Sequence, residues 1–308
     1  MKKFSTSALS SSIIVATLLV SPITRAEEYI HNPSVDLTGK FSKGRDISEF
    51  NYMQPLLDTG NTLPIIDLKL KLDNKKSKEI NLGLVLRHNY EDKAIFGTYA
   101  YFDHRQTTNK FSVSGLTAGV EILSKYIDAR ANIYVPQNKT KKIKTTKNSL
   151  GTSLHFIHVM SNSSYVLSAA RGYDIEIGTP IFAFSDALNE KIGTKVHVAR
   201  YSFKGKNTKA IKGTRFRLEQ DIATMWAGDH SYKLHMNAET QFDKVRKRQN
   251  FVGLGLKVTF NDKINAGKKS PNSLDHRMME TIIQDAHEIK SSEIDNNSDE
   301  YESEIDNN

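Results

Sequence analysis

The sequence lacks cysteine and lacks any long apolar run after its first residues. The absence of cysteine excludes disulfide frameworks and thiolate metal sites, and it suits a chain that crosses an oxidising compartment. Beyond residue 26 no stretch approaches the roughly 18 apolar residues of a membrane-spanning helix, which excludes helical membrane folds. A membrane barrel stays open, because its strands need only about 9 to 11 residues and only every second one faces lipid.

The first 26 residues have the parts of a secretory signal peptide. Lys2 and Lys3 precede an apolar stretch from Ile13 to Val20, and Ala26 closes a site with small residues at the positions that a signal peptidase reads. We therefore expect cleavage after Ala26. The mature chain is then expected in the periplasm, in the outer membrane or outside the cell.

Charge is unevenly distributed along the chain. The net charge is +8, but residues 291–308 carry seven acidic residues and no basic one. A basic body can bind nucleic acid, yet the basic residues here do not gather on one helical face. We predict no nucleic-acid partner, and we interpret the lysine run at residues 139–147 as a solvated connection or a contact with anionic lipid headgroups.

From residue 46 to 260, apolar residues recur at alternate positions in segments of about ten. This period is typical of strands with one apolar and one polar face. The segments are longer than the five or six residues usual in soluble sheets, carry charges along the polar face and have aromatic residues near their ends, as in a closed membrane barrel. We expect twelve strands, near residues 46–57, 63–73, 79–89, 94–104, 111–123, 125–136, 148–159, 164–177, 194–204, 210–222, 231–243 and 249–260.

The expected fold class is therefore all-β, an antiparallel transmembrane β-barrel of about 12 strands over residues 46–262. Residues 27–45 are expected to be a lead segment. With a periplasmic N-terminus, these strands place the long connections 137–147 and 178–193 on the periplasmic side, against the usual habit of such barrels. Counting residues 34–42 as a strand would reverse the sides but give an odd number of strands.

The alternation also predicts which side chains face lipid and which face the lumen. Opposite charges mix on single strands, which favours ion pairs across the lumen wall over a ring of one sign. The expected lipid-facing residues are Leu82, Leu84, Ile127, Ile133, Phe216, Leu218, Leu234, Met236, Leu254 and Leu256. The expected lumen-facing residues are Asp128, Arg130, Asn132, Arg215, Arg217, Glu219, Asp221, Lys233, His235, Asn237, Glu239 and Gln241.

Six short motifs follow one another between residues 52 and 136. They are Gln54-Pro55-Leu56-Leu57, Leu63 to Leu68, Asn81-Leu82-Gly83-Leu84 with Arg87-His88, Gly97 with Tyr101-Phe102-Asp103, Gly119-Val120-Glu121, and Ala131 to Pro136. Together they resemble the β-domain of inverse autotransporters, the intimin and invasin type of outer-membrane protein. Two positions depart from that pattern: Val85 stands where a glycine is usual, and Tyr99 where asparagine is frequent.

The resemblance implies an outer-membrane barrel that anchors and exports the chain after its last strand. It also implies outer-membrane lipid, the barrel-assembly machinery and periplasmic chaperones as partners, and an adhesion-related role toward a host surface. Members of the family normally carry long passengers, whereas 48 residues follow Phe260 here. The alternative is a passive porin or structural outer-membrane protein without a secretion role.

The residues after the barrel fall into two parts. After a linker from residue 263, apolar residues at helical spacing from Leu274 to Ile289 predict an amphipathic helix over 274–290. The resemblance implies that this helix lies in the lumen, although a charged wall offers its apolar stripe few partners. Residues 291–308 contain Ser-Glu-Ile-Asp-Asn-Asn twice, and this acidic tail is expected to be disordered and to emerge outside the cell.

No motif for catalysis or for metal binding is found. His155 and His158, three residues apart in an expected strand, would point to opposite faces and could not share a metal ion. Other histidines near acidic residues, such as His88 and His235, are explained by rim and lumen positions, although a rim-site enzyme is a third, less favoured reading. Because no serine elbow or phosphate loop is present, we expect no enzyme and no cofactor.

Overall fold

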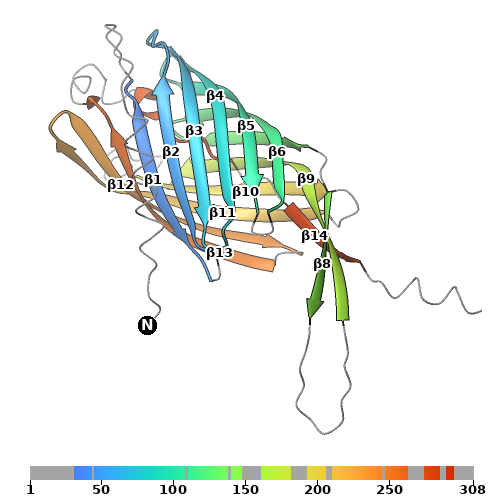
Figure 1. The fold of residues 1–308 in the computed structure, drawn as a ribbon. Coiled ribbons are helices and arrows are strands. Elements are labelled where there is room, and N and C mark those ends of the chain that lie inside the picture. Colours follow the sequence, from blue (N-terminus) through green and yellow to red (C-terminus); the bar gives the residue numbers. More distant parts are fainter. Residues whose placement is uncertain are drawn as a thin grey trace, which may run out of the picture.

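The computed structural model describes residues 31–43, 45–107, 110–137, 140–147, 161–181, 193–205, 210–244, 247–262, 274–284 and 289–294. Almost all of these residues are strands (Figure 1). The strands are β1 Ser34–Phe41, β2 Ile47–Pro55, β3 Thr62–Asp73, β4 Lys78–Tyr90, β5 Ala94–Gln106, β6 Ser112–Ser124, β7 Asp128–Pro136, β8 Thr140–Lys147, β9 Ser161–Pro180, β10 Thr194–Gly205, β11 Ile211–Ala227, β12 His230–Asp243, β13 Lys247–Thr259 and β14 Ile289–Ile294. A short 3-10 helix, η1, covers Leu274–Arg277.

The twelve strands other than β8 and β14 close into an antiparallel barrel. Strands β1 to β7 pair in order, β9 follows β7, β10 to β13 continue the ring, and β13 returns to β1 with Val258 opposite Val35. Closure pairs the first strand with the last, so the ring has no free edge. The predicted fold class and strand number are confirmed.

One predicted boundary is wrong, because the barrel begins at Ser34 and not at residue 46. Residues 34–41 form β1, which pairs with both β13 and β2. Together with the twelve strands expected from the sequence, this strand would have given an odd number, and only its pairing with β13 and β2 places it in the ring. The strand expected at residues 148–159 lies outside the described residues.

The added strand also settles which connections share an end of the barrel. We call the end where β1 begins and β13 ends the proximal end, and the opposite end the distal end. The connection between β7 and β9 lies at the distal end, where β8 and the first part of β9 form a hairpin that projects beyond the ring (Figure 1). The connection between β9 and β10 lies at the proximal end.

Burial along the strands is inverted relative to a soluble protein. Strand β4 alternates buried and exposed residues along its whole length, and Leu84 is 63% exposed whereas Arg87 is fully buried. Soluble sheets bury the apolar face, since exposed apolar surface costs free energy in water. Among the described residues, no helix is long and apolar enough to cross a membrane.

The predicted lipid-facing residues lie on this outer surface. Leu218, Leu234 and Met236 are half-buried. Ile127 lies in the turn between β6 and β7, not in a strand. Leu82, Leu84, Ile127, Ile133, Phe216, Leu254 and Leu256 are exposed. Their contact with lipid stays a prediction.

Inside the barrel, glycines make room for tyrosines on neighbouring strands. A Cβ atom on Gly83 would lie 2.3 Å from the Tyr101 ring, and one on Gly119 would lie 2.3 Å from the Tyr99 ring. The Tyr99 hydroxyl donates to Asn132 at 2.7 Å, so the residue that departs from the family pattern is packed and hydrogen-bonded. The inner wall is therefore tightly filled where glycines and aromatic rings meet.

We expect Gly83→Val to destabilise the barrel by about 1–3 kcal/mol, the usual cost of overpacking a filled interior. The added side chain would displace the Tyr101 ring, whose hydroxyl donates to Asp67 at 2.6 Å. Urea unfolding in lipid vesicles measures the effect. The matched control is Ala100→Val, because Ala100 lies on the outer face opposite Leu84 of the neighbouring strand. Equal unfolding midpoints for the two variants would contradict this packing.

Candidate functional site: a chain segment threaded through the lumen

The segment Leu274–Gln284 lies inside the barrel, but it is not the predicted helix. Only η1 is helical, residues 278–284 have no regular helix, and Ile289–Ile294 form strand β14. The helix predicted for 274–290 is therefore wrong. So is the disorder predicted for the start of the tail, because β14 extends to Ile294. Residues 295–308 lie outside the described residues.

A cluster at the proximal end holds the beginning of the segment. The ring of His31 lies between two acceptors, with Nδ1 2.8 Å from an Asp58 carboxylate oxygen and Nε2 3.1 Å from the Asp275 carbonyl. Asn89 donates to the Asp275 carboxylate at 2.7 Å. Burial raises the pKa of the Asp58 carboxyl, but hydrogen bonds from the His31 ring and from the Gly60 amide outweigh it and hold the pKa below its usual value. Asp58 thus stays ionised as the partner of His31.

Arg277 is the strongest side-chain anchor of the segment. Its guanidinium makes two hydrogen bonds to the Asp128 carboxylate, at 2.9 and 2.7 Å, and also contacts the Ser124 carbonyl. Glu280 of the segment accepts from the same guanidinium at 2.8 Å and pairs with Lys195 of β10 at 2.8 Å. Both Arg277 and Asp128 are almost fully buried. Paired geometry of this kind is what makes a buried charge tolerable.

Wall side chains also bind the main chain of the segment. Arg87 donates to the carbonyls of Met278 and Glu280 at 2.7 and 2.8 Å. Lys69 donates to the Ile282 carbonyl at 2.7 Å. The remaining donors of this kind are Lys257 to Met279, Asn132 to Ile283 at 3.3 Å and Lys71 to Gln284 at 3.4 Å. These bonds explain why no helix forms, since the carbonyls are bound by the wall and not by amides four residues on.

An apolar pocket in the wall receives the apolar side chains of the segment. Leu274, Met278, Met279 and Ile282 are all buried in one cluster with wall residues. The wall residues of this cluster include Met53, Leu63, Ile65, Val85, Ile95 and Leu123. The expectation that a charged wall offers few apolar partners is therefore wrong. The signal was visible in the apolar run from Leu63 to Ile66, which supplies apolar residues to both faces of β3.

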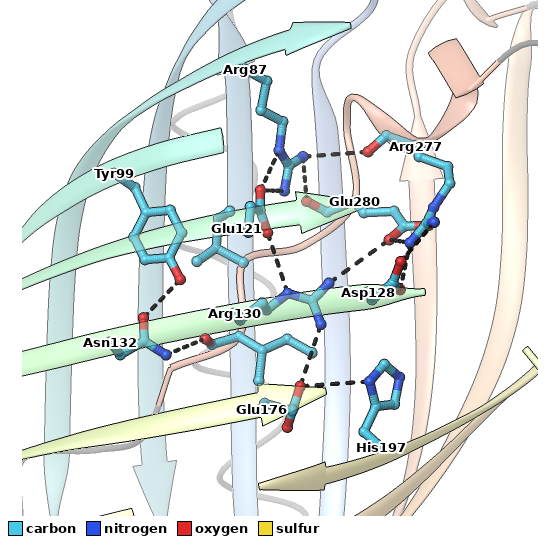
Figure 2. Close-up of polar contacts among 12 residues, drawn as sticks. Arg87, Tyr99, Glu121, Asp128, Arg130, Asn132, Glu176, His197, Arg277 and Glu280 are labelled. Carbon is cyan, nitrogen blue, oxygen red and sulfur yellow. Dashed lines mark hydrogen bonds and ion pairs between the residues drawn. The ribbon is translucent and has the colours of Figure 1, made fainter. Parts of the chain in front are cut away.

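A network of buried charges crosses the lumen wall beside the segment (Figure 2). Glu121 joins Arg87, at 2.7 Å, to Arg130, at 3.2 Å. Arg130 continues to Glu176 at 3.4 Å, which also pairs with Arg215 and Arg217. Each of these buried charges therefore has a partner of opposite sign on another strand.

The structure brings some of the predicted lumen residues into this network and leaves others at its margin. Asp128, Arg130, Asn132, Arg215 and Arg217 are buried around the segment. Asp221 pairs with Lys233, and His235 with Asp36, away from it. Glu219, Asp221, Lys233, His235, Asn237, Glu239 and Gln241 line a cavity of about 310 Å³. The same cavity is lined by Arg130, Arg215, Arg217 and residues 280–284, so it lies directly beside the segment in the lumen.

Several residues of the site were not singled out as lumen positions from the sequence. Arg87 and Glu121 stand inside the family motifs, and Lys69, Lys71 and Lys257 stand on polar faces of alternating strands, so their positions carried a signal. Glu176 lies on β9 and joins three arginines. His31 precedes the first strand, and nothing in the sequence pattern pointed to it.

The chain reappears beyond the distal end as β14. This strand pairs with the first part of β9, from Ile289 opposite Ala169 to Ile294 opposite Ser164. Strand β8 pairs with the same stretch of β9, so β8 and β14 lie on its two edges. The contacts of Asp275 are at the proximal end, and those of Gln284 involve Lys71 near the distal end of β3. The segment thus passes through the barrel from one end to the other.

The family model of the inverse autotransporter β-domain matches residues 15–217. The chain belongs to this family. The resemblance carried by the six motifs is confirmed, and this β-domain is an outer-membrane barrel, a class that associates with membrane lipid.

Solved structures are similar to this chain at low sequence identity. A membrane protein from work on the mechanism of in-meso crystallisation has 11% identity and a TM-score of 0.58, covering 85% of this chain and 100% of its own. An outer-membrane channel from Pseudomonas putida has 9% identity and a TM-score of 0.47, with coverage of 78% and 99%. The β-domain of the Bordetella autotransporter BrkA has 10% identity and a TM-score of 0.35, with coverage of 75% and 98%. The first likeness shows a common fold; no curated protein matches the chain.

Proposed function

We propose that this β-domain anchors the chain in the outer membrane and passes its own C-terminal segment through the lumen to the cell surface. The observation that carries the proposal is the threading. Residues 274–284 are bound inside the lumen, and β14 pairs with β9 beyond the distal end. A closed barrel has no lateral opening, so a segment with contacts at both ends has to pass through the pore.

The direction of passage follows from the chain ends. The expected signal peptide lies shortly before Ser34, and β1 begins at the proximal end. A chain that inserts from the periplasm leaves that end on the periplasmic side. The projecting hairpin of β8 and β9 then lies outside, in keeping with the habit of long connections in such barrels. Residues after β14 would be displayed at the surface.

A tag placed after Asn308 tests the proposal. We expect an antibody to bind the tag on intact cells as strongly as it binds after the outer membrane is permeabilised. The matched controls carry the same tag in the β7–β9 connection, expected to be labelled on intact cells, and in the β9–β10 connection, expected to be labelled only after permeabilisation. Labelling of the C-terminal tag only after permeabilisation, with the β7–β9 tag exposed, would defeat export.

The polar cavity beside the segment supports a second candidate, the passive porin. A porin of this build would conduct steadily with the segment in place, and its tail would not need to reach the surface. Bilayer conductance of the unmodified protein separates the two functions, because we expect only small currents past a segment held by the wall.

The proposed partners follow from the class of protein. Insertion of the barrel would depend on the barrel-assembly machinery and on periplasmic chaperones. The displayed residues would contact a host surface, and no catalytic role is proposed.

A further inference from the structure

The lumen wall recognises the segment mainly through its main chain. The carbonyls of residues 277–280 and 282–284 each accept a hydrogen bond from a wall side chain. The donors come from four different strands: Lys69 and Lys71 from β3, Arg87 from β4, Asn132 from β7 and Lys257 from β13. We call these five residues the carbonyl track.

We infer that the carbonyl track is a binding site for extended polypeptide of any sequence. This rests on the proposed function and names its substrate class. Every residue carries a main-chain carbonyl, proline included, so donors that bind carbonyls cannot distinguish one side chain from another. An extended chain presents a new carbonyl about every 3.3 Å, and the wall could pass each one to the next donor as the chain advances.

The chemistry of the donors suits a moving ligand. A lysine amine has three donor hydrogens on a flexible stem, and an arginine guanidinium has five, so each can release one carbonyl while it binds another. Arg87 shows this sharing, since a single nitrogen reaches the carbonyls of both Met278 and Glu280. The Arg87 guanidinium is held by Glu121, and the Lys69 amine lies 3.5 Å from Asp67, so neither charge is left without a counterion when a carbonyl departs.

Side-chain recognition is concentrated at the proximal end. There Arg277 binds Asp128, and the apolar pocket receives Leu274 and Met278. These contacts depend on the identity of the residues, unlike those of the carbonyl track. The two sets of contacts therefore have different roles. The carbonyl track binds any chain in the pore, whereas the contact of Arg277 with Asp128 fixes the final position of the native chain.

The test compares export of two fusions to the full chain. The first fusion carries an epitope directly after Asn308. The second carries an unrelated polar segment of about 30 residues between Asn308 and the same epitope. This length is close to that of the native chain from the start of the lumen segment to its end. In a double variant, Lys69→Met with Lys257→Met, surface labelling of intact cells after a pulse of synthesis should slow by the same factor for both fusions. That factor should be roughly a hundredfold, about tenfold for each of the two lost hydrogen bonds to a charged donor.

The control is a second pair of lumen lysines that bind acids of the wall and not the segment. Lys40 pairs with Glu49 and Lys233 with Asp221, so Lys40→Met with Lys233→Met removes two charges without touching the track. We expect this variant to export both fusions at the unmodified rate. Heat modifiability on gels reports whether each barrel has folded. If the track variant slows only the native fusion, or behaves like the control, a sequence-independent track is ruled out.

Export by the unmodified chain separates the two hypotheses. If the native fusion reaches the surface but the unrelated one does not, the track inference fails and the proposed function stands. If neither fusion reaches the surface, the proposed function fails. If the track variant does not fold, Ile283→Ser with Gln284→Ala in the segment decides, since it keeps both carbonyls. Unchanged labelling then supports the track, and a loss overturns it.

Discussion

Replacing Arg277 by alanine is expected to release the threaded segment from the lumen. The change leaves the buried Asp128 carboxylate without the two hydrogen bonds that it now accepts. Breaking a buried ion pair by removing one partner costs about 3–5 kcal/mol, and part of that cost can be relieved only if the segment leaves and water enters. In planar lipid bilayers the unmodified protein should show small currents, and Arg277→Ala should show large, fluctuating openings.

Two further variants identify the cause of such openings. Arg277→Lys keeps the charge but loses the two-pronged geometry, so we expect an intermediate frequency of openings. Arg248→Ala removes an exposed arginine of β13 and should leave the currents unchanged. If the Arg277→Ala variant showed currents as small as those of the unmodified protein, Arg277 would not be the anchor. A large steady current through the unmodified protein would instead favour the porin reading.

The second large effect is expected at the outer surface. Arginine at Met236, midway along β12 on its apolar face, should destabilise the barrel by about 2–4 kcal/mol, because a charge at the bilayer midplane loses its hydration. Urea unfolding in vesicles measures this cost. The neighbouring change Asn237→Arg places the same charge in the polar cavity and should cost far less. Equal costs at the two positions would show that the assignment of faces in β12 is wrong.

Local periodicity was enough to predict the barrel. Successive side chains in a strand point to opposite faces. An alternation such as that around Leu84 and Arg87 therefore indicates one face toward an apolar surrounding and one toward a polar interior. The same logic predicted twelve strands, but that count includes residues 148–159, outside the described residues, and omits β1, which only its pairing with β13 makes part of the ring. The six motifs identified the family because they lie in strands with a regular order.

The contacts inside the lumen could not be predicted from local periodicity in the same way. The lumen residues come from strands far apart in sequence, and the partner of Arg87, Glu121, is two strands away. Mixed charges predicted ion pairs in general, but not the particular joining of Arg87, Arg130 and Glu176 through shared carboxylates. The apolar cluster of the wall was not predicted, because charged residues dominate the polar faces of most strands, and Leu63 and Ile65 lie inside only through the register of β3 with its neighbours.

By itself, the sequence determined that this chain forms a closed barrel with an apolar outside and a charged inside, since a two-residue period follows from strand geometry alone. Only the tertiary structure decided the conformation of the residues after the barrel. The spacing from Leu274 to Ile289 suits a helix, and in isolation nothing competes with it. In the lumen, donors from β3, β4, β7 and β13 bind the carbonyls that a helix would use, so no regular helix continues beyond the short η1. Those donors lie between 22 and 213 residues away in the sequence, so no local pattern could reveal the competition.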